Sequence, residues 1–404
     1  MTAEPHPLTV VGIGADGWDG LTGPARAALT GADVVFGGDR QLALLPPAVA
    51  ARRVPWPSPL LPALPGLLDD HRGQAVSVLA SGDPMWHGIG ATLVRLAGPD
   101  AVRVLPHPSS ASLAAARLGW PLADTDVLSL VTAPVEELHP LVHPGRRILV
   151  LSRDGATPAR VAALLTARGY GDSPLTVLSQ LGGPTEHAVT GTAADWAHPD
   201  TDPLNVIAVD CRGPGRPVPC VPGLPDELYD TDGQLTKREV RAVTLAALGP
   251  QPGELLWDVG AGSGSIGIEW MRTHRSCRAV AVESAAERAA RVRANAAALG
   301  VPALRVVHGR APDALAGLDA PDAVFIGGGL TRDGVLDTCL SALRGGGRLV
   351  ANAVTVESEA VLAAWHTRLG GELSRIAVSR GAPVGGFTGW RAMMPVTIWS
   401  VTKP

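Results

Sequence analysis

The chain contains little of several features that would point to a nucleic-acid partner. Aromatic residues make up only 4% of its 404 residues, so an aromatic stacking surface for single-stranded nucleic acid is not available. Lysine occurs only at Lys237 and Lys403, the net charge is −4, and no dense basic block is present. The sequence therefore does not favour nucleic-acid binding.

Cysteine pairs and long apolar runs are also missing. The four cysteines show no C-x-x-C pair and no accompanying histidine pattern, which argues against a zinc site, an iron–sulfur cluster or a disulfide framework. No stretch approaches the roughly 18 consecutive apolar residues of a membrane span, and the first residues do not resemble a secretion signal. We therefore expect no metal site, no membrane partner and a cytoplasmic protein.

Two glycine-rich loops are present, and each follows a short apolar, β-branched run. The first lies in residues 10–17, and the second lies in residues 255–265. Neither ends in the Gly-Lys-Ser/Thr sequence of a triphosphate-binding loop. Since the length predicts two or three domains, the loops indicate two α/β units in tandem, each binding a small molecule.

A proline- and glycine-rich stretch divides the chain. Residues 211–228 can hold neither a helix nor an interior strand, so we predict a linker there, between a domain at 1–210 and a domain at 229–404. On both sides, strand-like and helical runs alternate, which predicts parallel sheets in both halves. The predicted strands are 9–13, 34–36, 75–80, 102–105, 147–151, 176–178, 206–210, 255–259, 279–282, 304–308, 323–326 and 348–353. The predicted helices are 23–29, 111–118, 158–168, 265–272, 285–299 and 335–343.

The second glycine loop carries the more specific pattern. Its glycines, Gly260, Gly262 and Gly264, lie between a strand and a helix, where the backbone can approach a ligand closely. The next strand ends in Glu283, which is placed to accept both hydroxyls of a ribose. Dinucleotide sites use G-x-G-x-x-G, and Asp258 would repel a pyrophosphate but suits the ammonium group of a methionine. We therefore favour S-adenosylmethionine over NAD.

Several stretches of the second half together resemble one enzyme family. Residues 235–241, 257–265, 321–329, 351–357 and 395–399 are similar to the decarboxylating precorrin-6B C15-methyltransferases of cobalamin biosynthesis. The resemblance covers about residues 229–404 and implies a Rossmann-like methyltransferase fold. The cofactor-binding residues that it implies, together with Asp258 from the loop pattern, are Thr236, Gly260, Ala261, Gly262, Ser263, Gly264, Glu283, Arg310 and Ala311.

The first half resembles the C5-methyltransferases of the two-lobed tetrapyrrole methylase fold. The resemblance rests on the first glycine loop, on residues 81–84 (Ser-Gly-Asp-Pro), on residues 108–120 and on residues 204–206. In that family the ligand lies between two α/β lobes. The cofactor-binding residues that the resemblance implies are Gly12, Gly14, Ser81, Gly82, Asp83, Ser109 and Ser110. Where the family usually has His-Gly-Arg, residues 129–134 read Ser-Leu-Val-Thr-Ala-Pro, so the contacts normally made there to substrate carboxylates are unassigned.

Together the resemblances imply S-adenosylmethionine-dependent methylation of a precorrin at C5 and C15, with loss of the ring-C acetate carboxyl as CO₂. Because the meso carbons of such a macrocycle are enamine-like, methyl transfer needs proximity and orientation more than an activated side chain, and we assign no catalytic residue. Since a guanidinium binds carboxylates bidentately, arginines are candidates for holding the substrate. These candidates are Arg238, Arg241, Arg375 and Arg391.

Other interpretations stay open at this point. The second half also resembles tRNA adenine methylases, although the absence of a basic block argues against an RNA substrate. The first half could bind and deliver the tetrapyrrole without catalysis. Residues 385–390 could form a flap over the macrocycle or a simple hairpin turn. Relatives of the second half commonly assemble, so we expect a homo-oligomer.

Overall fold

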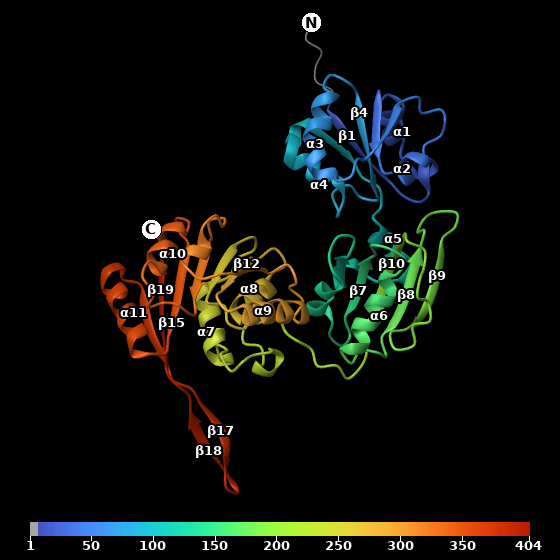
Figure 1. The fold of residues 1–404 in the computed structure, drawn as a ribbon. Helices are drawn as coiled ribbons and strands as arrows, with labels where there is room; N and C mark the ends of the chain where they lie inside the picture. Colours follow the sequence, from blue (N-terminus) through green and yellow to red (C-terminus); the bar gives the residue numbers. More distant parts are fainter. Residues whose placement is uncertain (1–6) are drawn as a thin grey trace. The chain divides into compact units, whose positions relative to one another are not determined.

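The computed structural model describes residues 7–404, which form two compact units (Figure 1). The chain divides between Arg216 and Pro217, inside the predicted linker 211–228. The first unit contains the residues up to 135 and residues 143–216, whereas residues 136–142 belong to the second unit with residues 217–404. The predicted domain 1–210 is therefore interrupted, and the second part of the proline-rich stretch packs on the second unit, where Leu224 is buried.

The first lobe of the first unit is built on an all-parallel, five-stranded sheet of order β3-β2-β4-β1-β5. Buried apolar residues fill both faces, as expected of a sheet covered by helices. Its strands are β1 (Leu8–Ile13), β2 (Val34–Gly37), β3 (Arg52–Pro55), β4 (Val76–Ser81) and β5 (Val102–Leu105). Its helices are α1 (Gly23–Thr30), α2 (Asp39–Ala43), α3 (Leu60–Asp70) and α4 (Ile89–Ala97).

The second lobe has a five-stranded sheet of order β6-β7-β10-β8-β9 in which only β6 and β7 pair in parallel. The prediction of a parallel sheet is wrong for this lobe. The reason is that β8 and β9 are joined by the short segment 180–186, and antiparallel strands need no helical crossover. The elements are α5 (Ser110–Leu118), β6 (Thr125–Ser129), β7 (Arg147–Leu151), α6 (Thr157–Ala167), β8 (Pro174–Ser179), β9 (His187–Thr192) and β10 (Asn205–Asp210).

The second unit contains a seven-stranded sheet of order β13-β12-β11-β14-β15-β19-β16, in which β19 runs antiparallel to β15 and β16. Its strands are β11 (Leu255–Val259), β12 (Arg278–Glu283), β13 (Arg305–His308), β14 (Ala323–Ile326), β15 (Arg348–Ala353), β16 (Glu372–Ile376) and β19 (Val396–Thr402). Its helices are α7 (Arg238–Leu248), α8 (Ser265–Thr273), α9 (Ala286–Ala298), α10 (Val335–Ala342) and α11 (Val356–Leu369). Each predicted strand and helix of the chain is present within two residues of its predicted bounds.

The order of the strands determines where a ligand can bind in this unit. From β11 the chain continues to β12 and β13 on one side, and from β14 it continues to β15 on the other side. The loops after β11 and β14 therefore diverge at the carboxyl edge of the sheet. Ligands of open α/β sheets bind at such a reversal.

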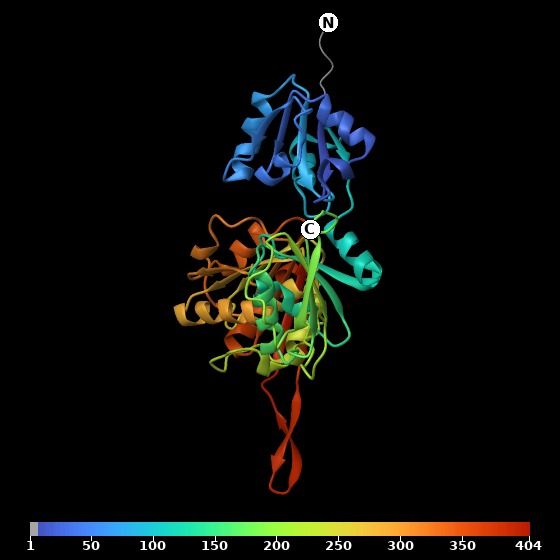
Figure 2. The same ribbon diagram turned by 90° about the vertical axis from the view of Figure 1, so that its right-hand side faces the viewer.

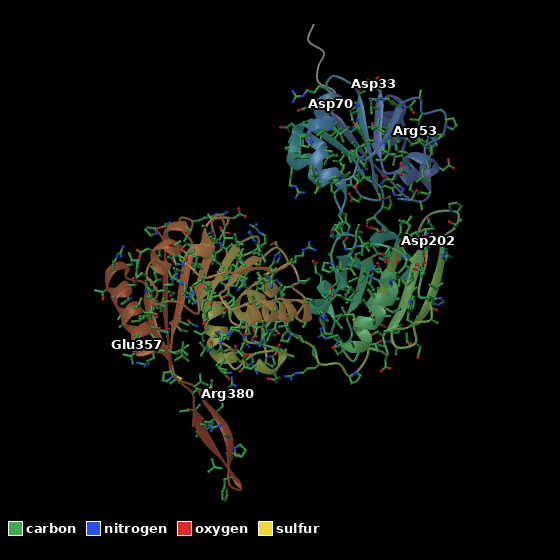
Figure 3. All side chains as sticks on the ribbon, viewed as in Figure 1. Asp33, Arg53, Asp70, Asp202, Glu357 and Arg380 are labelled. Carbon is green, nitrogen blue, oxygen red and sulfur yellow. The ribbon has the colours of Figure 1, made fainter. Side chains whose placement is uncertain are left out.

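A two-stranded ribbon extends from the second unit. β17 (Ser379–Val384) and β18 (Phe387–Ala392) pair antiparallel on either side of Gly385 and Gly386, and the ribbon projects from the main sheet (Figures 1 and 2). At its base, Arg380 donates hydrogen bonds to Glu239 at 2.6 Å and to Asp226 at 3.0 Å (Figure 3). Residues 385–390 thus form the turn and the first part of the second strand of a hairpin.

Short 3-10 turns connect several of these elements. They are Gly17–Gly20, Pro99–Ala101, Leu122–Asp124, Val135–Leu141, Asp226–Leu228 and Asp313–Leu315.

Candidate functional site

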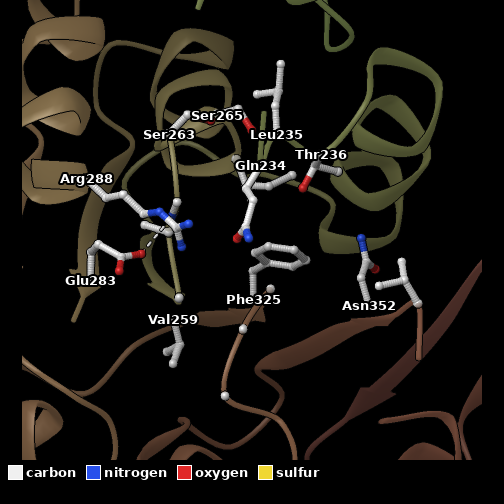
Figure 4. A pocket seen from close by; sticks show the side chains of 18 of the residues that line it. Gln234, Leu235, Thr236, Val259, Ser263, Ser265, Glu283, Arg288, Phe325 and Asn352 are labelled. Carbon is white, nitrogen blue, oxygen red and sulfur yellow. Dashed lines mark hydrogen bonds between the residues drawn. The ribbon is translucent and has the colours of Figure 1, made fainter. Parts of the chain in front are cut away.

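The second unit has a cavity of about 920 Å³ at the carboxyl ends of its central strands. Figure 4 shows Glu283 and Arg288 on one side of it, Asn352 on the other, and Gln234 and Phe325 between them. The predicted residues that line it are Thr236, Gly260, Ala261, Gly262, Ser263, Glu283, Arg310 and Ala311. Tertiary folding thus brings together residues from the glycine loop, from two further strand ends and from the segment before α7.

The glycine loop needs glycine for two different reasons. Gly260 has φ +72°, and a Cβ at this position would lie 2.6 Å from the backbone of Gly328, so the loops after β11 and β14 touch here. Gly262 has φ +61° and faces the cavity, and its N–H donates to Glu283 Oε2 at 2.9 Å. Both positions require a left-handed backbone that other residues rarely adopt.

The carboxylate of Glu283 lines this cavity and is held in one orientation by two backbone N–H groups. Glu283 ends β12, is only 4% exposed, and accepts hydrogen bonds from the N–H groups of Gly262 and of Ala285, the latter through Oε1 at 2.9 Å. Each carboxylate oxygen can accept more than one hydrogen bond, so Glu283 retains acceptor capacity toward the cavity. The arrangement can hold a pair of neighbouring hydroxyls.

Asp258 does not lie where the sequence suggested. Its side chain is fully buried and does not line the cavity, and its Oδ2 accepts the N–H of Gly267 in α8 at 2.9 Å. The pKa of Asp258 is raised to about 7, mainly by burial and to a lesser degree by the nearby Glu283 carboxylate, while the hydrogen bond from Gly267 lowers it. Our expectation that Asp258 contacts an ammonium group is therefore wrong, because the side chain points into the core beside α8.

The buried carboxyl of Asp258 predicts a dependence of stability on pH. In the unfolded chain its pKa lies near 3.8, so between about pH 4 and pH 7 the folded chain keeps a proton that the unfolded chain releases. Stability conferred by this group therefore falls as the pH rises through that window. Asp258→Asn, whose amide oxygen can still accept the Gly267 N–H, should gain stability over the natural chain by roughly 1–3 kcal/mol more at pH 8 than at pH 5. Thermal unfolding at the two pH values measures this, and an equal gain at both would contradict it.

Gly264 also lies outside the cavity lining. It has φ +79°, and a Cβ there would lie 2.7 Å from Val292 Cγ1 of α9. Its role in this structure is close packing between the loop and a neighbouring helix, which is the usual function of a third glycine in such loops.

The arginines predicted to hold a substrate do not line the cavity. Arg238 and Arg391 are exposed outside it, and Arg375 pairs with Glu359 at 3.0 Å. Arg241 is fully buried in α7, where its Nε donates to Glu269 at 2.5 Å and its other nitrogens donate to the carbonyls of Thr236 and Leu224. The prediction is therefore wrong for Arg241, because its donors are already used inside the core.

The structure instead places other cations around the cavity. They are Lys237, Arg288, Arg310 and Arg332, of which only Arg310 was a sequence-based candidate. Arg288 pairs with Asp232, and Arg332 lies 3.5 Å from Asp313. Within residues 7–404, Lys237 and Arg310 have no hydrogen-bond or ion-pair partner through their side chains. Lys237 lies within the Thr-Lys-Arg-Glu segment that carries the family resemblance, so the sequence did contain a signal for it.

The first unit has its own cavity, of about 500 Å³, lined by residues of both lobes. Six of the seven residues predicted for this half line it, namely Gly14, Ser81, Gly82, Asp83, Ser109 and Ser110. Gly12 does not, because it packs against the backbone of Gly82 and His107. Asp83 accepts a hydrogen bond from the Met85 N–H at 2.9 Å. The Ser81 hydroxyl accepts hydrogen bonds from the side chains of Arg40 at 3.0 Å and Gln41 at 2.9 Å.

Two arginines from different lobes line this first cavity, and the sequence did not single out either. Arg40 is the second residue of α2, and burial lowers its pKa. Arg153 follows β7 and donates to the carbonyls of Val131 at 3.1 Å and Ala133 at 3.2 Å. Neither guanidinium has a carboxylate partner among the described residues. An arginine therefore lies beside segment 129–134, although the chain lacks His-Gly-Arg there.

Two further findings concern metals and membranes. Across the described part of the chain, no group of three or more His, Cys, Asp or Glu side chains is arranged to hold a metal ion. Within the same residues, none of the helices is both long and apolar enough to span a bilayer.

Comparisons with known proteins identify both halves. Residues 7–197 match the family of Tetrapyrrole (Corrin/Porphyrin) Methylases, and residues 227–403 match the family described as Precorrin methyltransferase domain.

Two curated relatives match nearly the whole chain. A Precorrin-6Y C(5,15)-methyltransferase (decarboxylating) from Mycobacterium tuberculosis (strain CDC 1551 / Oshkosh) is 52% identical over 399 residues, which cover 98% of this chain and 100% of the relative. A protein of the same description from Sinorhizobium sp is 50% identical over 398 residues, covering 98% and 96%. A solved structure, the C-terminal domain of precorrin-6Y C5,15-methyltransferase from Rhodobacter capsulatus, is 45% identical, covers 46% of this chain and 99% of its own, and has a TM-score of 0.44. The chain belongs to the family of decarboxylating precorrin-6Y C(5,15)-methyltransferases.

Proposed function

We propose that each unit binds S-adenosylmethionine and methylates a precorrin, the first unit at C5 and the second at C15 with loss of the C12 acetate carboxyl. The observation that supports this most strongly is the Glu283–Gly262 arrangement, in which a buried carboxylate is held at the edge of a glycine-loop cavity. The first unit supports it with six matching residues around a separate cavity.

The residues of the second cavity fit the methyl donor. Glu283 would accept the two ribose hydroxyls, and the Gly260–Ser263 backbone leaves room for the donor to approach closely. The turn at Arg310 and Ala311 would lie at the adenine edge. When bound, S-adenosylmethionine supplies an electrophilic methyl group and departs as a neutral thioether.

The protein contributes to the reaction by orienting the two reactants and by excluding water from them. The meso carbon of a reduced tetrapyrrole is already nucleophilic, so holding it in line with the methyl group contributes most of the rate. For decarboxylation, the electrons of the breaking C–C bond can flow into the conjugated macrocycle as CO₂ leaves, and a proton then adds to the side-chain carbon to give a methyl group. Removing water from the carboxylate favours its loss. Phe325 and Val259 supply apolar surface at this cavity.

Cations around the two cavities suit a substrate with many carboxylates. In the second unit these are Lys237 and Arg310, and in the first unit they are Arg40 and Arg153. All four lack a carboxylate partner within the described residues, so they can pair with the substrate without breaking an existing ion pair.

Arg153→Gln should raise the KM for the precorrin in the first methylation by about five- to tenfold, because one charge-assisted hydrogen bond is lost. The KM for S-adenosylmethionine should stay unchanged. Arg95→Gln is the matched control, since Arg95 lies on α4 of the same unit and contacts only Thr92 at 3.1 Å. Steady-state kinetics of both variants measure this, and an unchanged precorrin KM in Arg153→Gln would remove Arg153 from the substrate site.

The function itself is tested by incubating the full chain with precorrin-6Y and S-adenosylmethionine. The expected product carries two additional methyl groups and has lost one CO₂, as read by mass spectrometry. Parallel assays with tRNA test the alternative of an RNA methyltransferase, which the relatives do not favour because those that match nearly the whole chain are named as precorrin enzymes. Methylation of tRNA, with no change in the precorrin, would overturn the proposal.

We further propose a cytoplasmic homo-oligomer, with the hairpin as the contact between copies. Phe387 is 85% exposed and Trp390 is 82% exposed on β18, which is unusual for large apolar side chains. Phe387→Ser combined with Trp390→Ser should therefore lower the molar mass measured by light scattering. A monomeric natural chain would contradict the proposal.

A further inference from the structure

A polar pair formed by a buried histidine and a half-buried aspartate lies outside the cavity lining of the first unit. Asp16 belongs to the loop after β1, and His107 follows β5, 91 residues further along the chain. His107 Nε2 lies 3.1 Å from Asp16 Oδ2, and the side chain of His107 is only 7% exposed. Neither residue lines the cavity. A buried imidazole needs polar partners, and the half-buried Asp16, whose side chain is 28% exposed, supplies one.

Two glycines lie against this pair, Gly14 in the first glycine loop and Gly20 just after it. A Cβ at Gly14 would lie 2.7 Å from His107 Cε1 and 2.6 Å from Asp16 Oδ1. A Cβ at Gly20 would overlap the Asp16 carboxylate, and one at Gly12 would lie 2.7 Å from the His107 nitrogen of the backbone. Of the two glycines that the sequence suggested as ligand contacts, Gly14 also makes room for the Asp16–His107 pair, whereas Gly12 makes room for the backbone of Gly82 and His107.

The pair connects two segments beside the cavity, and a backbone hydrogen bond holds a third next to them. Asp16 lies in the β1 loop, and the Nδ1 of His107 is 3.2 Å from the carbonyl oxygen of Pro108, which precedes Ser109 and Ser110. The third segment, after β4, is held to the same place, because the Gly82 N–H donates to the carbonyl of Ile13 at 3.0 Å. Fixing these loops before a ligand arrives reduces the ordering that binding must otherwise impose.

We propose that Asp16 and His107 are positioning residues, which hold the first unit's loops in the conformation that binds the methyl donor. The inference rests on the proposed donor site of the first unit. The second unit needs no such pair, because its loop is held by Glu283 from within the cavity. Loss of the pair should therefore weaken donor binding at the first site alone.

The test compares Asp16→Ala and Asp16→Asn by calorimetric titration with S-adenosylhomocysteine. All chains also carry Gly262→Arg, which blocks the second site, so the heat reports the first site. Asp16→Ala should raise the Kd about tenfold, the scale of one lost hydrogen bond to a charged group. Asp16→Asn keeps an oxygen acceptor for His107, so its Kd should lie closer to that of the chain with Asp16. His71→Gln is the control, since His71 is a histidine of the same lobe whose partners, the Leu67 carbonyl, Arg52 and the Phe36 ring, lie outside the cavity lining.

Kinetics separate a positioning role from general destabilisation. In the chain without Gly262→Arg, Asp16→Ala should raise the KM for S-adenosylmethionine in the first methylation and leave its kcat at saturating donor. The donor KM of the second methylation should stay the same. The inference would be overturned if Asp16→Ala left the Kd for S-adenosylhomocysteine at the first site unchanged. It would also be overturned if Asp16→Asn and His71→Gln raised that Kd as much as Asp16→Ala does. If the chain with Asp16 intact shows no first-site binding, the proposed donor site itself fails.

Discussion

Gly262→Arg should abolish the methylation and the decarboxylation proposed for the second unit, while methylation by the first unit continues. Gly262 lines the second cavity with φ +61°, and its N–H holds Glu283. An arginine there is strained by the left-handed backbone and has to extend into the space that the donor needs. We expect a loss of at least about 100-fold in the second step, equivalent to roughly 2.7 kcal/mol. Product masses after incubation with precorrin and S-adenosylmethionine measure this.

Gly82→Arg is the matching variant of the first unit. Gly82 has φ +59°, lines the first cavity, and lies against the backbone of Pro108 and Ser109. It should block the first methylation, so that product with two added methyl groups is no longer formed. Gly66→Arg is the control in the same unit, because a Cβ at Gly66 meets no atom within 4 Å. If Gly82→Arg still yields the doubly methylated product, the first unit is not a methyltransferase, and the binding-and-delivery interpretation gains support.

Arg241→Ala should destabilise the second unit by about 3–5 kcal/mol, because it leaves Glu269 buried without its charged partner. Glu269 is 2% exposed and also accepts hydrogen bonds from Gly223, Leu224 and Tyr229. The variant removes the hydrogen bonds that hold the carbonyls of Thr236 and Leu224 as well.

Calorimetric unfolding of the full chain measures the effect of Arg241→Ala. Arg238→Ala, three residues earlier on α7, is the matched control, since Arg238 is exposed and its substitution should change stability by less than about 0.5 kcal/mol. Equal transition temperatures in the two variants would show that the buried ion pair does not contribute as expected.

Local patterns explain why most elements were predictable. β14 is a continuous apolar run buried at all four residues, and β11 is buried at all five and departs from such a run only at Asp258, so each matches the pattern of a buried strand followed by a turn. Elements without such runs were missed. β16 is exposed at four of its five residues, and β3 is exposed at three of four, so their formation depends on pairing with a neighbouring strand. The antiparallel sheet of the second lobe was also missed, because strand direction depends on connections that periodicity does not reveal.

In the candidate site too, some residues could be predicted from local sequence patterns and others could not. The glycine loop and Glu283 were predictable because each lies at the end of a recognisable strand, and parallel strands bring those ends to one edge. Asp258 was misassigned, because the direction in which its side chain points depends on α8 packing beside β11. Charge alone did not distinguish the buried Arg241 from the cavity-lining Arg153, since a guanidinium has the same sequence signature in both places.

The sequence by itself determined the family, the two glycine loops and the strand–loop–helix units that carry them, because these depend on residues close together in the chain. Only the tertiary structure decided which charged groups face a cavity and which are used inside the core. It also showed that the first glycine loop is packed around Asp16 and His107, a pair separated by 91 residues. Contacts between residues so far apart depend on strand order and side-chain packing, which no local pattern encodes.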